Sequence, residues 1–151
     1  DMLEVGNGGL TLERNKSHFA LWCMMAAPLV LGNDLRTITD DVLAIVTQKD
    51  LIAIDQDPLG RQAKRVKRGA RLDILVRPLD GGRAAVCFFN RGSVLGTSGR
   101  LDLGTLAADD YVALPAKDKY AFREIWSGES GEGTAIACKL KPDECKVFIV
   151  E

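Results

Sequence analysis

The stretch that decides the fold is Ser17–Arg36, which reads SHFALWCMMAAPLVLGNDLR. Its apolar residues recur at helical spacing, which predicts a helix that Thr11 can cap and that Pro28 ends. Leu29–Leu31 then form a short continuous apolar run, typical of a strand in a sheet that is covered on both faces. A helix followed by such a strand is part of the repeating unit of parallel α/β sheets and barrels.

The flanking segments extend this α/β pattern in both directions. Upstream, Met2–Val5 alternate in polarity and break into the glycine-rich run Gly6–Gly9, which indicates the end of a strand. Downstream, Thr39 is followed by two aspartates and opens a second predicted helix. Two βα units in fewer than 60 residues cannot close a barrel, which needs on the order of 250 residues. Either these two units pack directly against the rest of the chain in an arrangement of their own, or they are the last quarter of a barrel whose other strands lie on a different polypeptide segment.

After Asp57–Gly60 the apolar residues no longer recur at helical spacing. Short β-rich runs separated by glycine-rich and proline-rich turns predict an antiparallel β-sandwich. The predicted fold is therefore α/β plus all-β, with residues 1–57 as the C-terminal βα units of a barrel and residues 58–151 as the sandwich. The predicted strands are Arg71–Pro78, Arg83–Asn90, Tyr111–Pro115, Tyr120–Trp126, Thr134–Leu140 and Cys145–Val150.

Composition excludes several classes of partner. The chain has 20 basic and 21 acidic residues and a net charge of −1, so no overall field favours nucleic acid or anionic lipid. The longest apolar run, Phe19–Leu31, contains Pro28 and is too short to span a bilayer, which takes roughly 20 residues. We therefore expect neither a nucleic-acid partner nor a membrane partner.

The metal-binding and redox-active residue types are few. His18 is the only histidine, which excludes a multi-histidine metal site, and no CxxC motif is present. Cys138 and Cys145 flank a predicted turn, where a disulfide or two buried thiols are both compatible with the spacing. The sequence therefore predicts no metal site, and it leaves the cellular compartment open.

Three ordered motifs carry a family resemblance. Asp1–Gly9 (DMLEVGNGG), Ser17–Arg36 and Ile52–Gln62 (IAIDQDPLGRQ) closely resemble the C-terminal part of α-galactosidases of glycoside hydrolase family 27, the melibiase group. Glu124–Gly128 (EIWSG) matches a weaker motif in the sandwich of that family. In the family the opening residues end an Asn-Asp-Pro-Asp-Met run on the seventh barrel strand, and Asp1 and Met2 match its last two residues.

The resemblance implies a retaining glycosidase that hydrolyses terminal α-linked galactose without a cofactor. Such enzymes use two carboxylates about 5 Å apart. Both family aspartates lie upstream of the position matched by Asp1, so no catalytic residue is assigned here and the 151 residues alone are predicted to be inactive. The resemblance implies that Asp1 and Met2 line the galactose pocket. The implied partners are a galactose-containing saccharide and the N-terminal barrel segment, and a secreted, lysosome-like or bacterial cytoplasmic location would fit.

Other candidate residues have structural explanations. We expect Asp34 and Arg36 to satisfy a loop and each other. Asp55–Gly60 lacks the regularly spaced oxygen ligands of a calcium-binding loop, and it is interpreted as a rigid connection between the barrel part and the sandwich. The six cations in Arg61–Arg71 are interpreted as a solvated hairpin with its tip at Lys67–Ala70. Trp126 is expected in the core rather than as a sugar platform.

Two functional alternatives remain open at this point. The chain could act as a non-catalytic carbohydrate-binding or interaction module, which would require exposed aromatic residues on one face of the sandwich. Within the same resemblance, α-N-acetylgalactosaminidase and β-L-arabinopyranosidase are alternative activities.

Overall fold

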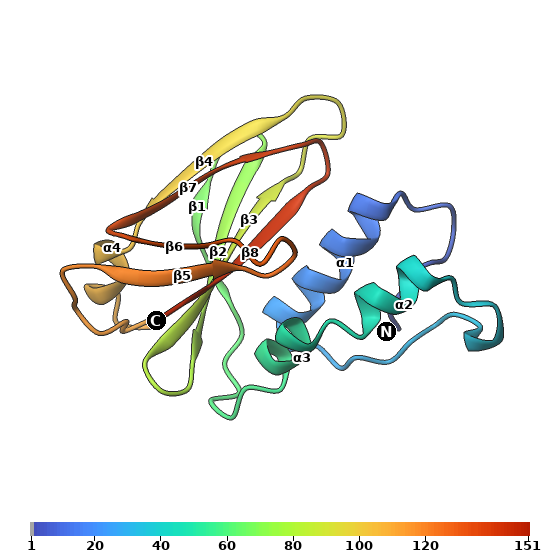
Figure 1. Ribbon diagram of the computed structural model, residues 1–151, viewed down its shortest axis with the longest axis horizontal. Coiled ribbons are helices and arrows are strands. Elements are labelled where there is room, and N and C mark those ends of the chain that lie inside the picture. The colour runs from blue at the N-terminus through green and yellow to red at the C-terminus, as the bar shows by residue number, and fades with distance from the viewer. Residues whose placement is uncertain (1) are drawn as a thin grey trace.

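The computed structural model describes residues 2–151 and has three layers (Figure 1). A six-stranded antiparallel sheet with the order β1-β2-β3-β8-β5-β6 lies in the middle. The two-stranded sheet of β4 and β7 covers one face, and α1 and α3 pack against the other. The helices are α1 Leu12–Met24, η1 Leu35–Thr37, α2 Asp40–Val46, α3 Lys49–Asp55 and α4 Gly104–Ala107. The strands are β1 Lys64–Arg68, β2 Leu72–Leu79, β3 Arg83–Asn90, β4 Thr97–Asp102, β5 Tyr120–Glu124, β6 Ser130–Gly133, β7 Ala135–Leu140 and β8 Cys145–Val150.

The N-terminal helices begin where the sequence predicts. Thr11 accepts a hydrogen bond from the backbone N–H of Arg14, and Thr39 accepts one from that of Val42, so both predicted caps are confirmed. Helix α1 ends at Met24, four residues before Pro28. A third helix, α3, was not predicted separately. The side chain of Gln48 caps it by accepting from the backbone N–H groups of Asp50 and Leu51.

The central sheet is apolar on both faces because each face has its own cover. In β3, Ala84, Val86 and Phe88 belong to the core under β4 and β7, whereas Ala85 and Cys87 belong to the core under the helices. Alternate residues of a strand point to opposite faces of a sheet. The middle strands therefore read as continuous apolar runs, which is why their prediction from sequence was correct.

The two-stranded sheet packs unusually close to the central one. A side chain at Gly99 of β4 would place its Cβ 2.6 Å from Cδ1 of Phe88 and 3.1 Å from Cδ2 of Leu72. Only hydrogen fits there, so a glycine stands inside a strand where it would otherwise weaken the strand. This glycine made Gly96–Gly99 look like a turn, and β4 was missed for that reason.

One predicted strand is wrong. Tyr111–Pro115 forms turn and irregular structure in place of a strand. Asp109 folds this segment by accepting hydrogen bonds from the backbone N–H groups of Tyr111 and Val112, both at 3.0 Å. Val112 and Leu114 are buried although the segment is not a strand, so their alternating apolar pattern led to the wrong prediction of a strand.

The basic segment forms the predicted hairpin, but its tip begins two residues and ends one residue later than the predicted Lys67–Ala70. Strand β1 ends at Arg68 and β2 begins at Leu72, so the tip is at residues 69–71. Two of its cations form ion pairs: Lys64 contacts Asp109, and Arg65 lies 3.6 Å from Asp73. Asp73 also pairs with Arg91 at 3.0 Å, which anchors the hairpin to the loop that follows β3.

All four cysteines are free thiols. Cys145 lies beside Cys87, with 3.1 Å between their sulfur atoms, so the contact is with β3 and not with Cys138. The contact with Cys87, together with burial, raises the pKa of Cys145, and burial raises the pKa of Cys138 to about 12. These thiols therefore stay protonated at neutral pH.

Candidate functional site

Two short parallel segments meet near the start of the described chain. Leu3 and Leu31 form a parallel β-bridge, in which the N–H of Leu3 donates to the carbonyl of Val30 at 2.7 Å and the N–H of Gly32 donates to the carbonyl of Leu3 at 2.9 Å. The predicted strand Leu29–Leu31 is reduced to this bridge, since Leu3 is its partner among the described residues. The bridge fixes Met2 next to the loop that begins at Gly32.

Gly32 and Met2 are in close contact. A Cβ at position 32 would lie 2.9 Å from the carbonyl oxygen of Leu3 and 3.4 Å from the Cβ of Met2. Leu3 is fully buried, but Met2 is 50% exposed, so its thioether is available as an apolar surface. The predicted substrate residue Asp1 lies outside the described residues.

The segment that follows Met2 is held to α1 by side chains. The backbone N–H of Glu4 donates to Nε2 of His18 at 3.1 Å, and the N–H of Gly6 donates to Oδ1 of Asn15 at 2.9 Å. Burial lowers the pKa of His18, which keeps the imidazole neutral and able to accept. The His18 ring also lies 5.0 Å from the ring of Trp22. His18 is therefore a helix-face residue that orients the strand end.

The loop after Leu31 contains both a satisfied pair and an unsatisfied amide. Arg36 and Asp34 form a bidentate ion pair with a shortest distance of 2.7 Å, and this hydrogen-bonded pair lowers the pKa of Asp34. Their predicted mutual pairing is confirmed. By contrast, the buried Oδ1 of Asn33 accepts no hydrogen bond from the described residues. The sequence-based site prediction left Asn33 out, although it lies two residues after the end of the predicted strand Leu29–Leu31, and we add it as a candidate pocket residue.

The Asp55–Gly60 connection is structural. The carboxylate of Asp57 accepts hydrogen bonds from the N–H of Asp80 at 3.0 Å and from that of Leu59 at 3.1 Å, so it ties α3 to the β2–β3 turn. Within residues 2–151, no three His, Cys, Asp or Glu side chains gather closely enough to hold a metal ion. None of the helices in this part of the chain has the length and apolar character needed to cross a membrane.

These observations define a class of protein: the end of a parallel α/β structure, with a half-exposed methionine beside two strand ends, joined to an antiparallel β-sandwich. Residues 1–57 match the family described as "Alpha galactosidase A", and residues 69–150 match the "Alpha galactosidase C-terminal beta sandwich domain". The chain belongs to glycoside hydrolase family 27, the α-galactosidase (melibiase) family. It comprises the C-terminal end of the barrel and the sandwich, as predicted.

Individual relatives agree with this assignment. α-Galactosidase A of Cellvibrio japonicus is 44% identical over 135 residues, which cover 87% of this chain and 33% of the relative. An α-N-acetylgalactosaminidase of Gallus gallus is 35% identical over 137 residues, covering 90% of this chain and 34% of the relative. The crystal structure of α-galactosidase I from Mortierella vinacea has a TM-score of 0.87 at 25% identity and covers 99% of this chain and 38% of that one. The chain thus spans about a third of the length of these relatives.

Proposed function

We propose that these residues are part of a retaining α-galactosidase that hydrolyses terminal α-linked galactose from oligosaccharides or glycoconjugates, without a cofactor. Residues 1–57 would complete the catalytic barrel, and residues 58–151 would form the supporting sandwich. The N-terminal barrel segment would supply the catalytic aspartate pair, since no such pair is assigned in this chain.

The observation that carries the proposal is the Leu3–Leu31 bridge. Active sites of (β/α)8 enzymes lie at the C-terminal ends of the parallel strands. The bridge aligns two such strand ends and leaves Met2 half exposed beside Gly32. In this position Asp1 and Met2 would line the galactose pocket, with the carboxylate accepting hydrogen bonds and the thioether forming an apolar wall.

The test of the pocket uses the full-length enzyme. We expect Asp1→Ala to lower kcat/KM on a chromogenic α-galactoside by about 100-fold, because a hydrogen bond to a charged group contributes roughly 1.5–3 kcal/mol. Met2→Ala should lower it by about tenfold and leave the free energy of unfolding nearly unchanged, since Met2 is half exposed. Asp110→Ala, an exposed change on the sandwich, is the control. Full activity of Asp1→Ala would disprove the pocket role.

A second measurement separates this chain from the whole enzyme. The purified 151-residue chain should not hydrolyse the chromogenic α-galactoside, whereas the full-length enzyme should. Hydrolysis that comigrates with the pure chain would show that a catalytic pair had been overlooked.

α-N-acetylgalactosaminidase is the second candidate, because the Gallus gallus relative is 35% identical. Comparing kcat/KM of the full-length enzyme on α-galactoside and α-N-acetylgalactosaminide decides between the two. A preference of about tenfold or more for the N-acetylated substrate would replace our first proposal.

A further inference from the structure

Two side chains on one face of α1 hold the two segments of the parallel bridge. His18 and Trp22 are four residues apart, which places them on the same face of the helix, and their ring centroids lie 5.0 Å apart. Nε2 of His18 accepts from the backbone N–H of Glu4 at 3.1 Å. The indole Nε1 of Trp22 donates to the carbonyl of Pro28, also at 3.1 Å. One helix face is therefore bonded to both segments.

Both contacts lie close to the bridge itself. In the first segment, Glu4 directly follows Leu3, whose N–H and carbonyl both pair with the second segment. In the second segment, the carbonyl of Pro28 also accepts from the N–H of Val30 at 3.0 Å, and the carbonyl of Val30 accepts from Leu3. A shift of either segment along α1 would consequently break one of the two helix contacts.

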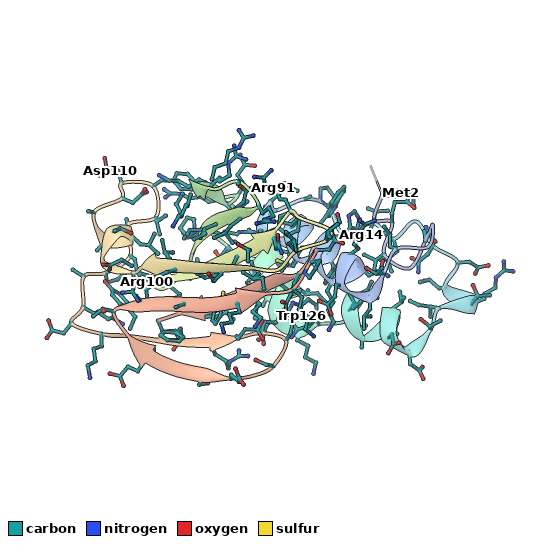
Figure 2. All side chains as sticks on the ribbon, turned by 90° about the horizontal axis from the view of Figure 1, so that it is seen from above. Met2, Arg14, Arg91, Arg100, Asp110 and Trp126 are labelled. Atoms are coloured by element: carbon teal, nitrogen blue, oxygen red, sulfur yellow. The ribbon has the colours of Figure 1, made fainter. Side chains whose placement is uncertain are left out.

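These segments present the candidate pocket wall. Leu3 and Val5 are fully buried. Met2 and Glu4 alternate with them and are exposed, as expected when successive side chains of an extended segment point to opposite sides. A Cβ at Gly32 would lie 3.4 Å from the Cβ of Met2 and 3.6 Å from Oε1 of Glu4, so both side chains border the same loop. Figure 2 shows Met2 on the helical side of the molecule. The position of the Met2 thioether thus depends on how firmly α1 holds this segment.

The hydrogen bond from Glu4 requires a neutral His18. A neutral imidazole that accepts at Nε2 carries its proton on Nδ1, and a protonated imidazole has no acceptor. Burial lowers the pKa of His18, and among the described residues the carboxylate of Glu4 is the charged group that opposes this shift. The other ring that His18 contacts, Trp22, carries no charge. The contact is therefore present at pH 7 and is lost as the pH falls through a pKa below 6.5.

We propose that His18 and Trp22 are positioning residues for the pocket wall at Met2, and that His18 performs this role only as a neutral imidazole. They act through the strand ends that they hold. This inference rests on the proposed function, because Met2 is a pocket wall only if the strand ends line a sugar site. It adds a pH dependence to that site: acidification releases the first segment and weakens substrate binding, whereas the contact made by Trp22 does not titrate.

The first test uses the 151-residue chain, which has a single histidine. NMR should give one imidazole titration with a midpoint below 6.5. The backbone amide resonance of Glu4 should shift with the same midpoint, because it loses its acceptor, and the methyl resonance of Met2 should follow. In His18→Gln, whose amide oxygen accepts without titrating, neither resonance should shift at this midpoint. A Glu4 amide that does not respond to the titration of His18 would overturn the inference.

The second test measures the kinetics of the full-length enzyme on a chromogenic α-galactoside at pH 7. His18→Leu removes the acceptor and should raise KM about fivefold with a smaller change in kcat, because the wall contacts the bound substrate. Trp22→Phe keeps an aromatic ring without the N–H and should raise KM by a similar factor. His18→Gln should keep KM near that of the parent. Lys16→Gln, on another face of α1, is the control and should leave KM unchanged.

The pH profile separates positioning from a general loss of stability. The KM of the parent divided by that of His18→Gln should be near one at pH 7 and should rise as the pH falls through the midpoint found by NMR. A loss of stability would lower the concentration of active enzyme, and with it the apparent kcat, without moving KM at that midpoint. Thermal unfolding checks that the variants fold, and if His18→Leu does not fold, the KM ratio decides by itself.

The failure of this inference differs from the failure of the proposed function. If the enzyme cleaves α-galactosides but KM is unchanged in His18→Leu, or the KM ratio stays flat with pH, the positioning role is wrong and the proposed function stands. If the enzyme cleaves no α-galactoside, the proposed function is wrong. Linked titration of His18, Glu4 and Met2 in the 151-residue chain would even then support the positioning of this strand end by His18.

Discussion

Arg77 is a fully buried cation at the contact between the helices and the sheet. It lies on the helix-facing side of β2, and its guanidinium donates to the carbonyl oxygens of Cys23 and Asp55, the latter at 3.1 Å. These carbonyls belong to the last turns of α1 and α3, and that of Cys23 also accepts from the backbone N–H of Ala26 at 3.2 Å. Burial lowers the pKa of Arg77, and the nearby carboxylates of Asp55 and Asp57 oppose that shift.

We expect Arg77→Met to lower the free energy of unfolding by about 3 kcal/mol, because the carbonyl of Asp55 loses its donor, that of Cys23 loses one of its two donors, and the Asp55 side chain loses its neighbouring charge. Arg68→Met is the matched control, since Arg68 is exposed on β1, and it should change stability by no more than about 0.5 kcal/mol. Urea unfolding of both variants makes the comparison. Equal stability of the two variants would show that Arg77 does not hold the layers together.

Asp109 is a residue whose effect depends on pH. Its hydrogen bond to Lys64 and those from the backbone N–H groups of Val112 and Tyr111 lower its pKa below the usual 3.8. A carboxyl group with a lowered folded-state pKa contributes stability above its unfolded pKa and loses it as pH falls through the folded one. Its contribution is therefore complete at pH 7 and fades below about pH 4.

Asp109→Asn should accordingly destabilise the chain at pH 7, and the difference from the parent chain should shrink as the pH falls below 4. The neighbouring exposed Asp110, labelled in Figure 2, supplies the control Asp110→Asn, which should have no such pH-dependent difference. Thermal unfolding measured from pH 3 to pH 7 tests this. A gap between Asp109→Asn and the parent that does not change with pH would contradict it.

At the scale of elements, the contact of β4 with the central sheet depends on Gly99. We expect Gly99→Val to lower the free energy of unfolding by about 2–3 kcal/mol, because its side chain would overlap the ring of Phe88. Gly133→Ala in β6 is the control, since an added Cβ there meets only ordinary contacts at 3.8 Å or more. Chemical denaturation of both variants is the measurement. A neutral Gly99→Val would mean that the two sheets can separate without cost.

Elements could be predicted from sequence where one periodic signal dominated. Local sequence alone determines the helix caps at Thr11 and Thr39 and the apolar strands β2, β3 and β8. Where the cause is a distant contact, sequence reasoning failed. Strand β4 depends on Gly99 fitting against Phe88, and the turn at Tyr111 depends on Asp109.

The candidate site was only partly predictable, for the same reason. Met2 could be named from the motif, but the buried, unpaired amide oxygen of Asn33 becomes visible only after its neighbours are placed. Trp126 was expected in the core, and it is in fact half-buried and packs against the core. A sequence shows which groups are polar, but it does not show which of them lack a partner.

At the scale of the whole molecule, the helices and the sandwich share one core. The cluster beneath α1 and α3 joins Phe19, Leu51 and Ile54 of the helical part to Leu79 and Val147 of the central sheet. Arg14 of α1 adds a polar link by pairing with Asp143 at 3.1 Å and donating to Ser93 at 3.2 Å. We therefore expect the chain to unfold in a single transition, with far-UV circular dichroism and tryptophan fluorescence coinciding.

A cut at the proposed boundary tests this shared core. Removing residues 1–57 would uncover the helix-facing side of the sheet, including Leu79, Ile125 and Val147, each of which contributes roughly 1.5–3 kcal/mol when buried. That total is comparable to the whole stability of a small domain, about 5–15 kcal/mol. Residues 58–151 alone should thus unfold at much lower urea concentration or self-associate through the bared face, measured by denaturation and by light scattering. If residues 58–151 alone were monomeric and as stable as the full chain, the helices would contribute nothing to the stability of the sandwich.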